Sequence, residues 1–131
     1  MRLHSLLAIV ALAGLMAVAL SARQDVTATL TPQEGIRLMR AVNTTEVQIK
    51  SGTGAYGALA DVIAHRTFSP GSAGAPALQG TDVALVQSYR LVLVRSANGE
   101  HYQAAMTPAS GGGTAWFTDE RGMIFLGQSL R

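Results

Sequence analysis

The sequence predicts an α+β fold in which one N-terminal helix packs on a small antiparallel sheet of two hairpins. Three observations support this prediction: a helix start signal at residues 31–34 with near-helical apolar spacing after it, a change to period-two alternation from Tyr89 onward, and an Asn98-Gly99 pair. A helix followed by strands is typical of an α+β domain. We therefore expect one domain over residues 31–131.

Ahead of this domain, the 131-residue chain has a short basic start and an unbroken apolar run from Leu6 to Leu20, followed by small residues. An apolar run of about 7–15 residues between such flanks is typical of a secretory signal peptide. A membrane-spanning helix needs about 20 apolar residues, which makes an uncleaved anchor the alternative. We expect residues 1–22 to be a signal peptide and 23–30 a polar spacer. The domain would then be periplasmic, secreted or at the cell surface, or anchored in the inner membrane if the run is kept.

The first helix is predicted to begin at Thr31. The Thr31 side chain can accept the amide of Glu34, the Glu34 side chain can reach back, and Pro32 sits where a missing N–H costs nothing. Gly52 and Gly54 are predicted to end the helix. The apolar positions at near-helical spacing are Ile36, Met39, Val42, Val47 and Ile49. The polar residues expected mostly elsewhere on the wheel are Arg37, Arg40, Asn43 and Gln48.

Two segments connect this helix to the sheet. Residues 58–65 carry a shorter apolar pattern, which predicts a second helical stretch. Residues 69–80 are rich in Pro, Gly and Ser and hold no charge, which is typical of a surface loop. We therefore expect no strand before Tyr89.

The first hairpin is predicted from Tyr89 onward, with Asn98-Gly99 as a two-residue turn in which both residues have positive φ. The facing pairs that follow from this turn are Arg95 with Tyr102, Leu93 with Ala104, and Leu91 with Met106. The apolar members of these pairs share one face of the sheet, which we expect to be the core face.

A second hairpin is predicted over residues 114–126, with a turn at residues 119–122. Asp119 at the first position and Gly122 at the fourth are the preferences of a type I turn. The residues expected to form the core are Ile36, Met39, Val42, Leu91, Leu93, Trp116 and Phe125.

Charge and composition exclude several classes of function. The formal net charge is +2, and the basic residues are scattered without aromatic interleaving, so nucleic-acid binding is not expected. The absence of cysteine removes disulfides, thiolate metal sites and cysteine nucleophiles. Asp61 and His65 are four apart and could bridge, but a metal site would need a further ligand. The glycine-rich stretch SGGGT lacks the lysine of a phosphate-binding loop. We expect no cofactor and no metal.

The stretch SANGEHY holds a serine, an acid and a histidine, but strand geometry separates them. Glu100 and His101 are neighbours on one strand and point to opposite faces, so Glu100 cannot orient the His101 ring. His101 would stand across from Ser96 with no acid placed to orient it. Asp119 and Glu120 lie in a turn rather than across a cleft, and Glu120 is expected to be solvated. We therefore expect turns and no enzyme.

Two long stretches resemble the globular heads of type IV pilins and type II secretion pseudopilins. The first, LMRAVNTTEVQIKSGTGAYGALADV, is similar to their helix end, Tyr-containing turn and short Leu-rich segment. The second, YRLVLVRSANGEHYQAAMTPASGGGTAWFTDERGMIF, is similar to their hairpin, Gly-rich link and aromatic strand. The resemblance implies a helix-on-sheet head that acts without catalysis, through contacts with envelope, pilus or secretion-system proteins.

The amino-terminal part departs from that family. A pilin leader ends in Gly before Phe or Met and places Glu at the fifth mature position. Here the only glycine in the apolar run is Gly14, and no acid precedes Asp25. Thr31 and Pro32 would also interrupt the single long helix of a pilin. We therefore expect the protein not to enter a pilus as an ordinary subunit.

A periplasmic or secreted binding module for a glycan or small ligand is the alternative function. In that case the uncharged 69–80 loop, the Gly-rich connector and Trp116 would line the site. The expected surface or ligand contacts are Trp116, His101 and Tyr56.

Overall fold

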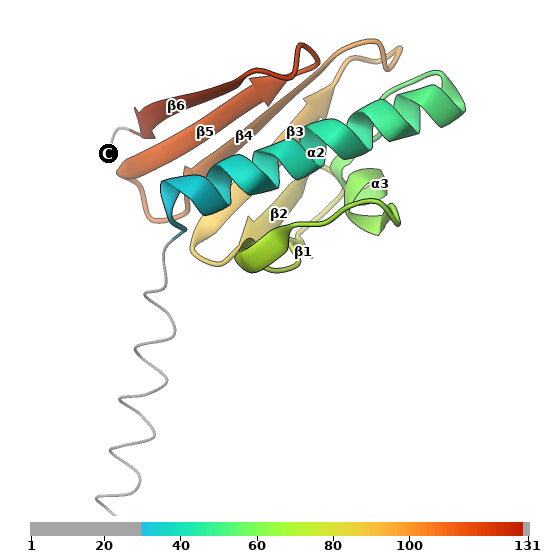
Figure 1. The fold of residues 1–131 in the computed structure, drawn as a ribbon. Coiled ribbons are helices and arrows are strands. Elements are labelled where there is room, and N and C mark those ends of the chain that lie inside the picture. The colour runs from blue at the N-terminus through green and yellow to red at the C-terminus, as the bar shows by residue number, and fades with distance from the viewer. Residues whose placement is uncertain (1–29, 130–131) are drawn as a thin grey trace, which may run out of the picture.

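The computed structural model describes residues 30–129, so the predicted signal peptide, and all of the predicted spacer except Leu30, lie outside the described residues. Leu30 itself is buried in the core. One long helix, α2 (Pro32–Thr53), lies across one face of a six-stranded antiparallel sheet, and a short helix, α3 (Leu59–Ala64), packs beside α2 and β3 (Figure 1). The predicted α+β class is confirmed. Within residues 30–129, no helix is both long and apolar enough to cross a membrane.

The sheet is a meander whose strands lie side by side in chain order. The strands are β1 (Ala77–Leu78), β2 (Val83–Val86), β3 (Tyr89–Arg95), β4 (Tyr102–Pro108), β5 (Gly113–Asp119) and β6 (Ile124–Ser129). The sheet therefore has more strands than the two predicted hairpins would supply. The predicted 69–80 loop contains a 3-10 turn, η1 (Gly71–Ala73), and β1. The run VALV of β2 is too short and too uniformly apolar to show a period.

Both ends of α2 are as predicted. Thr31 Oγ1 accepts from the Glu34 N–H at 3.2 Å, and Glu34 Oε2 accepts from the Thr31 N–H at 2.8 Å. Gly54 ends the helix in the left-handed conformation, with φ 86°, and its N–H donates to the Lys50 carbonyl. These bonds satisfy backbone groups that a helix end otherwise leaves without partners.

The buried stripe of α2 differs from the predicted one. Its buried residues are Gly35, Leu38, Met39, Val42, Asn43, Thr45, Glu46 and Ile49. Val47, one of the apolar positions at near-helical spacing, is 56% exposed, whereas Asn43 and Glu46 are buried. Steps of three and four residues from Val42 lead to Glu46 and Ile49 and pass over Val47. Burial therefore follows helix geometry at these positions even where the side chain is polar.

The predicted register of β3 and β4 is confirmed. The pairs are Arg95 with Tyr102, Leu93 with Ala104, and Leu91 with Met106. The apolar members of these pairs are buried under α2, in the main core cluster with Val42, Leu59 and Trp116. The expected core face of the sheet is thus the face that α2 covers.

The turn between β3 and β4 differs from the predicted type. Gly99 has φ 69°, but Asn98 does not have positive φ, so the prediction of a two-residue turn with both residues in that region is wrong. The Gly99 N–H donates to the Ser96 carbonyl, and the Ser96 N–H donates to the His101 carbonyl, which closes a longer loop. A Cβ at residue 99 would lie 2.7 Å from the Ala55 Cβ, so close packing also requires the glycine.

The turn between β5 and β6 is as predicted. The Gly122 N–H donates to the Asp119 carbonyl at 2.9 Å, which closes the four-residue turn. Phe125 on β6 was expected in the core, but it is 49% exposed. It pairs with Phe117 on the face opposite Trp116, and α2 does not cover that face.

Candidate functional site

The face of the sheet opposite α2 carries a row of apolar side chains that crosses five strands. The strand pairings place Val83, Val92, Ala105, Phe117 and Phe125 opposite one another in sequence. Phe117 keeps 43% of its surface exposed, and Phe125 keeps 49%. We call Val92, Ala105, Phe117 and Phe125, together with Val94, the open-face row.

A hollow of about 480 Å³ lies on the open-face row. Its lining combines row side chains with polar groups from the ends of β4 and β5: Val92, Val94, Gln103, Ala105, Phe117, Asp119, Arg121 and Phe125. An apolar floor with a few polar groups at one rim is typical of a surface that binds a partner.

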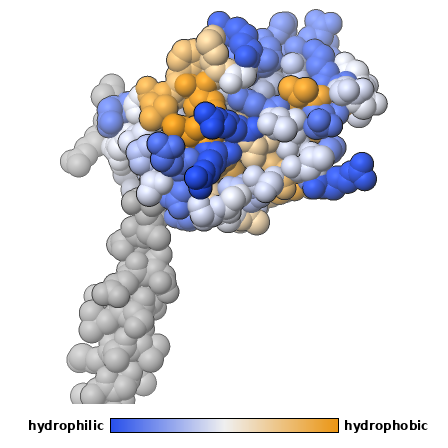
Figure 2. Space-filling view, in the orientation of Figure 1, coloured by the Kyte–Doolittle hydropathy of each residue, from blue (hydrophilic) through white to orange (hydrophobic). Residues whose placement is uncertain are grey.

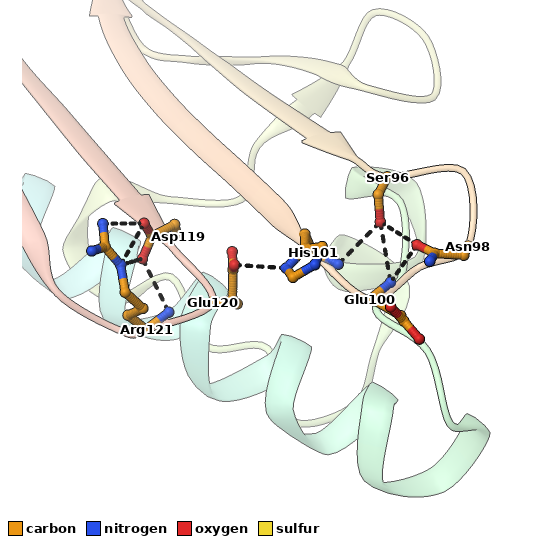
Figure 3. Close-up of polar contacts among 7 residues, drawn as sticks. All are labelled: Ser96, Asn98, Glu100, His101, Asp119, Glu120 and Arg121. Atoms are coloured by element: carbon orange, nitrogen blue, oxygen red, sulfur yellow. Dashed lines mark hydrogen bonds and ion pairs between the residues drawn. The ribbon is translucent and has the colours of Figure 1, made fainter.

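The polar rim of this hollow is an ion pair between Asp119 and Arg121. Arg121 Nη2 lies 2.7 Å from Asp119 Oδ2, and Arg121 Nε also donates to the carboxylate (Figure 3). The hydrogen bond from Arg121 holds the pKa of Asp119 below its usual value, and the same contact raises the pKa of Arg121. The two charges therefore compensate each other and leave the rim close to neutral.

His101 and Glu120 meet at the adjoining end of the sheet, between the β3–β4 and β5–β6 turns. His101 Nδ1 lies 2.9 Å from Glu120 Oε1 (Figure 3). The backbone N–H of Glu120, and then the bond with His101, hold the pKa of that carboxylate below its usual value. The expectation that no acid orients His101, and that Glu120 is only solvated, is therefore wrong. It failed because the two residues come from different hairpins.

Ser96 does not complete a relay with this pair. Its Oγ accepts the backbone N–H groups of Glu100 and His101, at 3.1 and 3.0 Å, and donates to Asn98 Oδ1 (Figure 3). The hydroxyl thus organises the turn and has no hydrogen bond to the His101 ring. A nucleophile needs such a bond to a base. The pair is an exposed one, with 68% of the His101 side chain accessible.

Tyr56, expected as a surface contact, packs mostly in the interior and reaches the surface on one side only. It is almost buried, and its ring meets the Tyr102 ring edge-on with centroids 4.7 Å apart. The Lys50 ammonium lies 4.3 Å from the centroid of the same ring. Arg95 donates to the Tyr56 carbonyl at 2.7 Å. One side of Tyr56 lines a hollow of about 510 Å³ between the end of α2 and α3.

Trp116 is not available as a surface contact. It has no exposed surface, and its ring meets the Tyr89 ring edge-on at 5.4 Å. The alternation of β5 turns Trp116 toward α2 and Phe117 away from it. Trp116 therefore offers no surface to a ligand.

Glu46 is a buried acid that the sequence interpretation missed. Its Oε2 accepts the Gly57 N–H at 2.8 Å, while its Oε1 has no hydrogen-bond partner within the described residues. Burial raises the pKa of Glu46 to about 7, against smaller lowering effects from the Gly57 bond and the Arg95 charge; the Asp61 charge also raises it. Its place between Val42 and Ile49 at helical spacing was the signal that could have revealed it.

A second buried polar group joins α2 to the sheet through Asn43. The Tyr102 hydroxyl donates to Asn43 Oδ1 at 2.7 Å, and Asn43 Nδ2 donates to Thr118 Oγ1 at 2.8 Å. Thr118 in turn donates to the Met123 carbonyl. This network fixes α2 over β4 and β5. Because its members are bonded to one another, it is suited to fixing the position of α2 rather than to binding.

The Asp61 and His65 bridge considered from the sequence is replaced by local bonds. Asp61 Oδ2 accepts the Ala58 N–H at the start of α3, and His65 Nδ1 contacts Thr67 Oγ1 at 2.7 Å. Across residues 30–129, no three His, Cys, Asp or Glu side chains gather closely enough to hold a metal ion.

Comparison with known proteins found no relative of this chain. No protein-family model, no curated protein and no solved structure matches the chain. The candidate site is therefore defined by its geometry: an apolar open-face row with a neutral rim, beside an exposed His101–Glu120 pair.

Proposed function

We propose that the protein is a non-enzymatic, exported domain that acts through protein–protein contacts in the cell envelope, with the open-face row as its contact surface. The observation that supports this most directly is the pair Phe117 and Phe125. Both rings are about half exposed, although a helix buries the opposite side of the same strands. Aromatic side chains gathered in an exposed patch are typical of protein interfaces.

A pilin-like relationship is part of the proposal. It is supported by the sequence resemblance and by the order of elements, since a long helix precedes an antiparallel sheet and lies across it. The two resembling stretches cover most of α2 and the start of α3 (residues 38–62), and β3 through the start of β6 (residues 89–125). Export is supported by the apolar run and the small residues after it. The partner would then be an envelope, pilus or secretion-system protein.

A role without catalysis is supported by the bonding of the reactive groups. The Ser96 hydroxyl is engaged by backbone amides, and the His101–Glu120 pair lies in the open rather than in an enclosed pocket. A general base acts on a substrate that the site holds in place. Within residues 30–129, the hollow that His101 lines measures about 350 Å³ and lies beside the exposed pair.

Site-specific photo-crosslinking tests this function. A photoreactive amino acid at Phe117 or Phe125, in cells that carry the natural gene, should give a crosslinked species of discrete size in the envelope fraction. The matched control is the same amino acid at Val47, an apolar residue that is similarly exposed but lies on α2. Equal crosslinking at all three positions, or none at Phe117 and Phe125, would contradict the proposal.

A further inference from the structure

Strand β6 (Ile124–Ser129) forms a long, open edge of the sheet. Within the described residues it pairs with β5 alone, so one side of its backbone has no strand partner. The opposite edge is different, because β1 is only two residues long. Unpaired N–H and C=O groups along an edge strand are a template for another strand.

The β6 edge lacks the features that normally prevent pairing. Residues 123–129 read MIFLGQS, with no charge and no proline. Charged side chains, proline and bulges are the usual means by which an edge strand avoids other chains. Met123, Phe125 and Leu126 are all about half exposed. This edge is therefore both open and apolar.

Apolar surface is present on both sides of the edge. Phe125 lies on the uncovered face beside Phe117, while Leu126 pairs with Trp116 on the face that α2 covers. The cover of α2 extends over Trp116 but leaves Leu126 half exposed. Figure 2 shows hydrophobic surface gathered at the upper left, where β5 and β6 lie. Only a neighbour that extends the sheet would bury both sides together.

We propose that β6 pairs antiparallel with β6 of a second copy of this chain, forming a continuous sheet across a twofold axis. In a twofold antiparallel pair, each residue faces a residue of the same segment in the other copy. Because the strand is uncharged, no like charges face each other in this arrangement. With Phe125 on the axis, Ile124 faces Leu126 and Met123 faces Gly127 of the other copy. The open-face row then continues from one copy into the next. This pairing stands on the edge strand and does not depend on the proposed envelope function.

A second copy fits this edge better than a charged partner peptide would. The strand itself carries no charge, and the nearby ion pair, Asp119 with Arg121, is already closed on itself. A charged peptide strand would therefore find no unpaired charge at this edge to complement its own. The area is small for a permanent interface, so we expect a weak, concentration-dependent dimer.

Sedimentation velocity on the protein purified from an expressing host tests the pairing. The unmodified protein should pass from monomer to dimer as its concentration rises. Phe125→Lys or Leu126→Lys should weaken the dimer at least about tenfold, because Phe125→Lys sets like charges opposite each other at the axis and Leu126→Lys sets a charge against the apolar Ile124 of the other copy. Val47→Lys should leave it unchanged. Since all three positions are exposed, circular dichroism should show the same fold in each variant.

A disulfide provides a second measurement that leaves the charge unchanged. The chain has no cysteine, so Phe125→Cys introduces the only thiol. Residues directly opposite in an antiparallel pair have Cβ atoms about 4.5–5.5 Å apart, near the reach of a disulfide. Mild oxidation should convert the Phe125→Cys protein to a covalent dimer, whereas Val47→Cys should stay mostly monomeric.

Three results would overturn the proposal. The first is a monomer at every concentration up to millimolar. The second is a dimer that Phe125→Lys, Leu126→Lys and Val47→Lys affect equally, which would place the interface elsewhere. The third is a monomer whose β6 amides are protected from hydrogen exchange, since another segment of the same chain would then occupy the edge.

Discussion

Trp116 and Phe117 are neighbours on β5, yet Trp116 has no exposed surface and Phe117 keeps 43% of its own. The difference comes from α2, which covers one face of the sheet and leaves the other open. Both faces present apolar rows built by the same strand alternation. The sheet alone would be apolar on both sides, and the helix decides which side becomes core.

The covered face is also the one that holds polar atoms without partners. Thr45 Oγ1, Glu46 Oε1 and Trp116 Nε1 are buried with no hydrogen bond in the part of the chain that the structure describes. Such atoms cost free energy in a folded protein. Burial under α2 is therefore stabilising through its apolar contacts and destabilising at these atoms. The side chains of the open face that stay exposed have neither effect.

The largest predicted difference between the faces is between Trp116→Ala and Phe117→Ala. Trp116→Ala should lower the free energy of unfolding by about 3–5 kcal/mol, because it removes a fully buried ring from the core. Phe117→Ala should cost less than about 1 kcal/mol, as expected for a substitution on an open surface. Chemical denaturation measures both. Equal losses would show that the open face is covered in the isolated protein.

Gly35 on α2 tests how closely the helix packs on the covered face. A Cβ at Gly35 would lie 2.2 Å from the Trp116 ring, whereas a Cβ at Gly52 would meet nothing within 4 Å. Alanine is favoured over glycine in helices by about 1 kcal/mol. Gly52→Ala should therefore stabilise the protein slightly, while Gly35→Ala should destabilise it by about 1–3 kcal/mol through overpacking. The melting temperatures should move in opposite directions, and a gain for both would mean that α2 can lift away from Trp116.

Glu46 predicts how the covered face responds to pH. Its pKa is about 7 when folded, against an ordinary value of 4.5. Between these values the folded state holds a proton that the unfolded state releases, so stability is full below pH 4.5 and falls as pH rises toward 7. We expect a loss on the order of 3 kcal/mol over that window. Glu46→Gln should remove this slope and be more stable than the natural protein at pH 8.

The control for this prediction is Glu34→Gln. Glu34 is an exposed capping carboxylate whose pKa is lowered, first by the Thr31 backbone N–H. Its contribution is present above its ordinary pKa of 4.5 and is lost as pH falls through its folded value, outside the Glu46 window. The slope between pH 5 and 7 should therefore persist in Glu34→Gln. A flat profile in the natural protein would contradict a buried, protonated Glu46.

The sequence predicted local features of the fold well. The capping box of Thr31 and Glu34, the glycine that ends α2 and the β3–β4 register all rest on contacts between residues near in the chain or joined by one turn. The prediction was wrong where packing of distant elements decides. Phe125 and Val47 are apolar but exposed, because α2 lies over the other face of the sheet and turns residue 47 outward.

The candidate site was less predictable than the fold. His101 and Glu120 are 19 positions apart in the chain and on different hairpins, and only the order of strands in the sheet brings them together. The open-face row spans four strands, and Val83 extends its line onto β2, a strand that was not predicted at all. The edge β6 could be recognised as uncharged from its sequence. Its position at the edge follows only from the topology.

The smallest expected effect is at the His101–Glu120 pair, which borders the open face. Both side chains reach solvent, and exposed ion pairs typically contribute about 0–1 kcal/mol. His101→Ala should therefore change the free energy of unfolding by less than about 0.5 kcal/mol. The pKa of Glu120 should rise but stay below its usual value, because the lowering effect of its own backbone N–H is larger than that of His101. A carboxyl NMR titration of the two proteins measures this shift. A loss of several kcal/mol, or a Glu120 pKa fully returned to its ordinary value, would mean that this pair holds the two hairpins together, and that the open end of the sheet is built as firmly as the covered face.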